Sequence, residues 1–108
     1  MYSIKHYVDP EGIDPYEQWF ESLSDIKTRA RIAARVERLY LGLFGDCKPI
    51  DKGVWELRID FGPGYRVYYA LDDGKVILLC EGGKKGTQKA DVKRAIARWQ
   101  DWQTRRST

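Results

Sequence analysis

The feature that most constrains the fold is the stretch 53–71, in which two segments rich in aromatic and β-branched residues flank Phe61-Gly62-Pro63-Gly64. In each segment apolar residues occupy every second position, which is typical of a strand with one buried face. A turn rich in glycine and proline between two such strands predicts a β-hairpin. The remainder of the chain must therefore cover the apolar face of an antiparallel sheet.

The register of this hairpin is limited, because both apolar sets must face one core. One allowed register places Leu57 opposite Val67 and Arg58 opposite Arg66. Two arginines side by side on a sheet repel each other. A sequence retains such a pair more readily if an anion binds there, so this pair is the first candidate for a binding site.

The residues before the hairpin predict a strand followed by two helices. Alternating apolar residues indicate a first strand at 2–8. Asp14-Pro15 is a strong helix start, because aspartate can cap and proline suits the first helical position. A second helix is expected at about 25–41, with Gly42 as its end. The residues expected to face inward from it are Ile26, Ala30, Ala33, Val36 and Tyr40.

The other segments predict a loop, a further strand and a last helix. Residues 46–52 are expected to form a connecting loop. Residues 76–80 are apolar on both faces, which is typical of a strand inside a sheet. Thr87 can cap a final helix. The apolar stripe expected on that helix consists of Val92, Ile96, Trp99 and Gln103.

The turn between the second strand of the central hairpin and the strand at 76–80 determines which residue lies opposite Arg66. Asp73-Gly74 is typical of a two-residue hairpin turn. With a turn of that length, Arg66 lies opposite Glu81.

The order strand, helix, helix, strand, strand, strand, helix predicts an α+β fold. Its small, mostly antiparallel sheet is covered by an N-terminal helical hairpin and a C-terminal helix. A chain of 108 residues suits a single domain over 1–108. No apolar run approaches the roughly 20 residues of a membrane span, and no export signal is recognisable, so a cytoplasmic protein without a membrane partner is expected.

Cofactor chemistry finds little support in the sequence. Cys47 and Cys80 fit no metal spacing and are expected to be reduced thiols. His6 is the single histidine, and an isolated histidine is typical of a surface or packed residue. We therefore expect no metal and no other cofactor.

Charge is distributed unevenly along the chain. Residues 1–25 are acidic and residues 84–108 are basic, although the net charge is only +3. A polarised surface of this kind suits a polyanion or an acidic partner segment, while a solvated helix face is the simpler explanation.

Four cations are expected to converge at one end of the sheet: Arg58, Arg66, Lys84 and Lys85. Tyr68 shares the Arg66 face, where it could stack on a base. The segment Gly82-Gly83-Lys84-Lys85-Gly86-Thr87 precedes a helix whose free N–H groups can bind an anion. The alternative is a set of ordinary ion pairs, such as Arg66 with Glu81.

Three segments together carry a family resemblance. They are Val54-Trp55-Glu56-Leu57-Arg58, Gly64-Tyr65-Arg66-Val67-Tyr68-Tyr69, and Leu78-Leu79-Cys80 followed by Gly82-Gly83-Lys84-Lys85-Gly86-Thr87-Gln88. In these the chain resembles the RelE/ParE toxin superfamily, and within it the HigB-like branch of phage-derived addiction-module killer proteins. The family's motif has an acidic residue where this chain has Lys84, so Lys85 is the better match to its lysine.

The resemblance implies a toxin of a type II toxin–antitoxin pair. Most such toxins cleave mRNA on the translating ribosome, so mRNA and the ribosome are expected partners, together with a cognate antitoxin that is a small helix-turn-helix protein. Toxins of the ParE kind inhibit DNA gyrase by binding, and a non-toxic interaction module of the same fold is a third alternative.

RNA cleavage can use the RNA's own 2′-hydroxyl as the nucleophile, so neither an enzyme nucleophile nor a metal is required. Arg58 and Arg66 suit stabilisation of charge on the phosphate, because guanidinium presents a fork to phosphate oxygens. Neighbouring cations favour the neutral form of Lys85, which suits proton transfer, and Glu81 is the alternative base. The residues expected to contact RNA are Lys84, Tyr68, Lys89 and Lys93.

The last helix carries two tryptophans with different expected roles. Trp99 lies on the apolar stripe and is expected in the core. Trp102 lies toward the edge of that stripe and is the candidate anchor for the antitoxin, because exposed tryptophans are enriched in interface hot spots.

Overall fold

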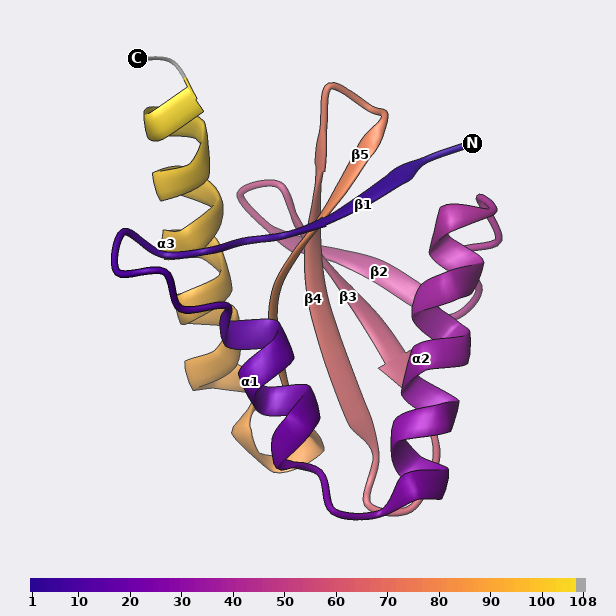
Figure 1. The fold of residues 1–108 in the computed structure, drawn as a ribbon. Coiled ribbons are helices and arrows are strands. Elements are labelled where there is room, and N and C mark those ends of the chain that lie inside the picture. The colour runs from indigo at the N-terminus through magenta and orange to yellow at the C-terminus, as the bar shows by residue number, and fades with distance from the viewer. Residues whose placement is uncertain (107–108) are drawn as a thin grey trace.

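The computed structural model describes residues 1–106 and contains a five-stranded sheet with helices on both of its faces (Figure 1). The strands lie side by side in the order β1-β5-β4-β3-β2. β1 is parallel to β5, and the other neighbours are antiparallel, as the predicted mostly antiparallel sheet requires. The strand bounds are Ser3–His6, Cys47–Asp51, Val54–Ile59, Tyr65–Asp72 and Val76–Lys84.

The helices form a layer on each side of the sheet. α1 (Pro15–Ser22) and α2 (Ile26–Tyr40) cover one face, and α3 (Gln88–Arg106), which follows the short 3₁₀ turn Lys85–Thr87, covers the other. Figure 1 shows α2 and α3 on opposite sides of the strands. The predicted α+β fold is thereby confirmed, with one strand more than the sequence indicated.

The additional strand is β2, which we expected to be a connecting loop. It pairs with β3, with Lys48 opposite Glu56 and Pro49 opposite Trp55, and it forms the edge of the sheet. Proline is tolerated at an edge because the outer side of the strand needs no N–H donor. The short β2 carries no clear apolar alternation, so its sequence alone favours a loop.

The register of the central hairpin is confirmed, and that of the next one is wrong. Leu57 lies opposite Val67 and Arg58 opposite Arg66. The β4–β5 connection is one residue longer than the predicted two-residue turn, since Asp72 pairs with Val76, and an irregularity follows between Tyr68 and Tyr69. As a result Arg66 lies opposite Gly83, and Glu81 lies opposite Tyr68.

The N-terminal helix start is confirmed. Asp14 caps α1, since its Oδ1 accepts a hydrogen bond of 3.0 Å from the Glu17 N–H, and Pro15 is the first helical residue. Gly42 follows the end of α2 with φ of +79°, a left-handed conformation that glycine adopts at little cost.

The face that α2 buries differs from the predicted one. Val36 is inward as expected, but Ile26 is 73% exposed, and Ala30, Ala33 and Tyr40 are exposed as well. Alanine fits either face of a helix, so the sequence pattern allowed two stripes. The residues buried from α2 are Thr28, Ile32, Val36 and Leu39.

Each face of the sheet has its own apolar cluster. The cluster under α1 and α2 includes Leu57, Val67 and Leu79, and the cluster under α3 includes Tyr68, Leu78 and Trp99. The predicted core position of Trp99 is confirmed, at 7% exposure. Consecutive residues of β4 and β5 point to opposite faces of the sheet, and helices cover both faces. Most residues of these two strands are therefore buried.

Cys47 and Cys80 are free thiols, as expected. Burial raises the pKa of Cys80 to about 12, so this thiol does not suit a nucleophile's role. Across residues 1–106, no helix is both long and apolar enough to cross a membrane.

Candidate functional site

Two strands bring Arg58 and Arg66 together on the face of the sheet that α3 covers. They are direct neighbours across β3 and β4. Arg66 is only 5% exposed, and its Nη1 donates a hydrogen bond of 3.0 Å to the Tyr65 carbonyl. A guanidinium buried this deeply needs nearby negative charge or an anion to offset its desolvation.

Arg58 lies nearer to solvent and has a carboxylate of its own. Its Nε and Nη2 donate to Asp46 Oδ1 at 3.1 and 2.8 Å, and about a third of its side chain is exposed. Asp46, from the residues just before β2, is therefore the ion-pair partner of Arg58. This contact offsets part of the repulsion between the two arginines.

Lys85 joins the arginines at the turn of the central hairpin. Its backbone N–H donates to the Gly64 carbonyl at 3.1 Å, and Gly64 has φ of +90°. A methyl group placed on Gly64 would lie 3.5 Å from Lys85 Cβ and 3.7 Å from Arg66 Nη1. Three of the four cations expected to converge, Arg58, Arg66 and Lys85, thus lie at one end of the sheet, and we call these three the cation cluster.

A buried carboxylate, Glu56, lies beside the cation cluster. Its Oε2 accepts hydrogen bonds from Tyr68 Oη at 3.2 Å and from Gln88 Nε2 at 3.0 Å. Its Oε1 lies 3.8 Å from Arg66 Nε. Among the described residues, neither of these two atoms has a hydrogen-bond partner, although both are buried.

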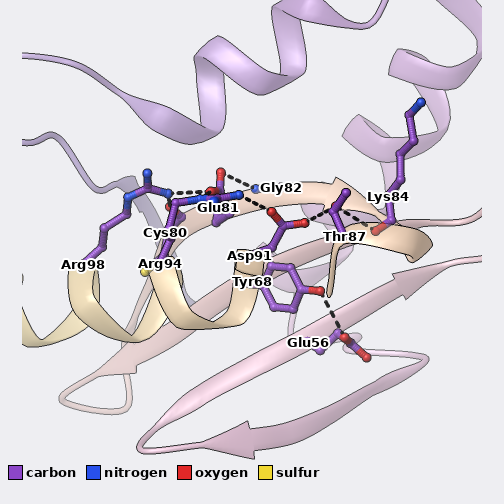
Figure 2. Close-up of polar contacts among 10 residues, drawn as sticks. All are labelled: Glu56, Tyr68, Cys80, Glu81, Gly82, Lys84, Thr87, Asp91, Arg94 and Arg98. Atoms are coloured by element: carbon purple, nitrogen blue, oxygen red, sulfur yellow. Dashed lines mark hydrogen bonds and ion pairs between the residues drawn. The ribbon is translucent and has the colours of Figure 1, made fainter. Parts of the chain in front are cut away.

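Tyr68 does not have the surroundings expected of a base-stacking residue. Its side chain is fully buried, and its hydroxyl is bonded to Glu56 (Figure 2). Burial, and after it the negative charge of Glu56, raises the pKa of Tyr68. The predicted stacking of an RNA base on this ring does not fit that burial; the hydroxyl serves to hold the Glu56 carboxylate.

The predicted RNA-binding lysines lie on different sides of the sheet. Lys84 is paired with Tyr65, on the face that α1 and α2 cover, and Figure 2 shows its side chain pointing away from Glu56. It therefore does not join the cation cluster. Lys89 and Lys93 are exposed on α3, one helical turn apart, after the loop that carries Lys85.

Glu81, the alternative base, is held by arginines of α3. Its Oε2 lies 2.7 Å from Arg94 Nε and 2.8 Å from Arg98 Nη1, and its side chain is 8% exposed. Figure 2 shows this group with Asp91, which also pairs with Arg94 and accepts a hydrogen bond of 2.5 Å from the Thr87 hydroxyl. The carboxylate of Glu81 is therefore held by ion pairs with two guanidinium groups of α3. The hydrogen bond from its hydroxyl to Asp91 links Thr87, the residue before α3, to the first turn of that helix.

The double glycine of β5 lets both helical layers approach the sheet. A methyl group on Gly82 would lie 2.0 Å from the indole of Trp19 in α1, and one on Gly83 would lie 1.9 Å from the carboxylate of Asp91 in α3. Consecutive residues of a strand face opposite sides, so each glycine leaves room for a different helix. The loop with Lys85 is placed by this packing.

One group of possible metal ligands lies away from the cation cluster. His6 Nδ1 is 2.6 Å from Asp14 Oδ2 and 3.9 Å from Glu17 Oε2. The three side chains come from β1, the cap of α1 and α1 itself, and their ligand atoms lie within 4.8 Å of one another. The hydrogen bond to Asp14, which also caps α1, gives His6 a structural role in tying β1 to α1.

Sequence reasoning missed Glu56 and Gln88. Glu56 is not among the predicted site residues, although the confirmed register places it opposite Tyr68. Gln88 carries no signal of its own in the sequence. Its contact with Glu56 exists because α3 crosses β3 and β4, which is a tertiary feature.

Comparison with known proteins gives two matches. Residues 18–100 match a family described as phage-derived protein Gp49-like, and this range includes the cation cluster, Glu56 and Gln88. An uncharacterized protein of Haemophilus influenzae is 44% identical over 80 residues, which span 74% of this chain and 81% of that protein.

Proposed function

Because the chain belongs to the family of phage-derived Gp49-like proteins, which are toxin-like proteins of addiction modules, we propose that it is the toxin of a type II toxin–antitoxin pair and cleaves mRNA on the ribosome. In this proposal it is a HigB-like member of the RelE/ParE superfamily. Its partners are an antitoxin, mRNA and the ribosome.

The observation that carries the proposal is the buried guanidinium of Arg66 within the cation cluster. Its neighbour across the strands is Arg58, and both Arg66 and Lys85 lie close to Gly64. A sheet end that keeps three cations near one another is suited to an anion with several oxygens, such as a backbone phosphate of RNA.

The proposed reaction is attack of an RNA 2′-hydroxyl on the adjacent phosphorus, with departure of the 5′-oxygen of the next nucleotide. Products are a cyclic 2′,3′-phosphate and a free 5′-hydroxyl. Arg66 and Arg58 stabilise the charge that develops on the phosphate oxygens. Lys85 accepts the proton of the attacking 2′-hydroxyl and passes it to the departing 5′-oxygen, so the step consumes no net proton. Lys89 and Lys93 bind the strand beside the cluster through its phosphates. Glu81 has no part in this scheme, because its carboxylate is paired with Arg94 and Arg98.

Expression of the chain alone in a bacterial host tests the function. We expect growth arrest, a rapid fall in translation, and new mRNA 5′ ends that carry hydroxyl groups within coding regions. Sequencing of 5′-hydroxyl ends before and after induction measures the cleavage. The matched control is Lys75→Ala, which removes an exposed cation at the opposite end of the β4–β5 hairpin and should leave arrest unchanged.

Other outcomes separate the alternatives. DNA damage and filamentation with intact mRNA would point to a gyrase inhibitor of the ParE kind and would overturn the ribonuclease proposal. A harmless product would speak against both toxin activities and favour a non-toxic interaction module.

Trp102 remains our candidate anchor for the antitoxin. It is partly buried against the cluster under α3, its Nε1 donates 3.0 Å to Asp72 Oδ2, and Arg105 and Arg106 lie beside it. We expect Trp102→Ala to weaken binding of the antitoxin encoded by the adjacent gene by about 2 kcal/mol, roughly 30-fold in Kd. Calorimetric titration of the purified pair measures the change.

The structure adds a control to this experiment. Asp72→Asn keeps the size of the residue that accepts from the indole, so it should disturb the packing of Trp102 less than Trp102→Ala does. Unchanged affinity in a folded Trp102→Ala variant would rule out the anchor. Loss of the circular dichroism signal would assign Trp102 to the core instead.

A further inference from the structure

Two buried atoms that face each other beside the cation cluster have no hydrogen-bond partner. Arg66 Nε and Glu56 Oε1 are 3.8 Å apart, and the two side chains are 7% and 2% exposed. That distance allows a strong charge interaction but exceeds hydrogen-bond length. Within the described part of the chain, Glu56 is the acid that forms an ion pair with Arg66.

We propose that Glu56 is the positioning residue of the cation cluster: it fixes the direction of the Arg66 guanidinium and, through Gln88, the loop that carries Lys85. This inference rests on the proposed function for its catalytic consequence, but its geometry stands on the contacts described here. Glu56 is too deeply buried to touch a substrate, so it acts through its neighbours.

The carboxylate is itself held from two directions. Tyr68, on β4, and Gln88, the first residue of α3, both donate to Oε2, which leaves Oε1 facing Arg66. A carboxylate held in this way can orient a guanidinium, because both side chains lose their alternative rotamers. The hydroxyl of Tyr68 stays protonated as a donor, since its pKa is raised by burial and by Glu56.

The same carboxylate links the sheet to the loop of the cation cluster. Gln88 follows the 3₁₀ turn Lys85–Thr87 directly, so its hydrogen bond to Glu56 fixes the end of that turn on β3. The other end is fixed by the bond from the Lys85 N–H to Gly64. Arg66 and Lys85 are therefore placed relative to each other through one buried acid.

The variant Glu56→Gln tests whether Glu56 acts by positioning its neighbours or only through its negative charge. The amide keeps the size of the side chain but removes its charge, so the protein becomes more cationic and should bind RNA no less tightly. We expect KM for a ribosome-bound mRNA to stay constant or fall, and kcat to fall at least tenfold. An electrostatic effect alone would lower KM and leave kcat unchanged, which would overturn the inference.

A measurement without RNA tests the geometry directly. In NMR spectra of the arginine Nε–Hε groups, the Arg66 proton should exchange with water at least tenfold faster in Glu56→Gln than in the wild type. The control is Glu81→Gln, which neutralises another buried acid and should change the signals of Arg94 and Arg98 but not that of Arg66. Unchanged exchange at Arg66 in Glu56→Gln would overturn the inference whatever the activity.

Two further outcomes keep this test independent of the proposed function. If wild-type protein does not cleave RNA, the proposed function fails, and the exchange rates still decide the role of Glu56. If Glu56→Gln does not fold, Glu56→Asp replaces it. The shorter side chain retains the charge but withdraws from Arg66, so kcat should again fall and the exchange should again accelerate; wild-type values for both would overturn the inference.

Discussion

Arg66→Ala is expected to abolish growth arrest and to slow RNA cleavage by roughly 10²–10³-fold, the usual effect of removing one preorganised donor from a transition state. The guanidinium is buried between the Glu56 carboxylate and the Tyr65 carbonyl, so a water molecule cannot replace it as the donor to the phosphate. Single-turnover cleavage of a ribosome-bound mRNA measures the loss, and growth on induction reports it in cells.

Two comparisons make this experiment specific. Arg66→Lys retains a cation beside Glu56 but loses the fork of the guanidinium, so we expect a folded protein with strongly reduced cleavage. Lys85→Ala should have a smaller effect than Arg66→Ala, because the lysine is exposed. If Arg66→Ala and Lys85→Ala both leave growth arrest undiminished, the cation cluster is not the site.

Gly82→Ala is expected to have the largest effect on stability. Its new methyl group would lie 2.0 to 2.4 Å from three ring carbons of Trp19, and a rigid indole can avoid it only by leaving its place between α1 and β5. We expect the free energy of unfolding to fall by about 3 kcal/mol, at the upper end for overpacked sites. Urea unfolding followed by circular dichroism measures the change.

The 3₁₀ turn that follows β5 offers a matched control. Apart from its two chain neighbours, no described residue has an atom within 4 Å of a methyl group added to Gly86, so Gly86→Ala should change stability by no more than about 0.5 kcal/mol. The double variant Trp19→Ala/Gly82→Ala should be more stable than the sum of the single changes predicts, because the smaller side chain leaves room for the methyl group. Additive effects would show that the indole is not the obstacle.

The parts of the fold that the sequence predicted are those governed by local rules. Alternation along β3 and β4 fixes which residues share a face, and it led to the correct pairing of Arg58 with Arg66. Capping chemistry likewise located the start of α1 at Asp14-Pro15. These rules need no knowledge of what packs on the other side of an element.

Other parts depend on contacts that no local pattern contains. The longer turn and the register irregularity beside Tyr68 together move Glu81 away from Arg66, and nothing in the residue types of β4 or β5 marks the irregularity. The face of α2 was ambiguous because alanines such as Ala30 and Ala33 suit the core or the surface. Edge strand β2 exists because β3 offers it a free side, although its own sequence resembles a loop.

The sequence predicts the cations of the candidate site but not its buried acid, Glu56. Arg58, Arg66 and Lys85 are recognisable by type and by the register of one hairpin. Glu56 looks like an ordinary polar residue of a half-exposed strand, and it becomes a buried acid only because α3 lies across that face. Lys84 is the opposite case, because its residue type suggests a member of the cation cluster. Its position in β5, opposite Tyr65, places it on the face of the sheet that α1 and α2 cover.

The parallel pairing of β1 with β5 determines the order in which parts of the fold can form during translation. Residues 3–6 have no strand partner until residues 76–79 have been synthesised, and Lys85, Gln88 and the rest of α3 follow later still. Pairing over so long a separation is slow to form, and it cannot begin before residues 76–79 exist. A protein whose proposed target is the translating ribosome therefore assembles its cation cluster only after β5 and Lys85 have been synthesised.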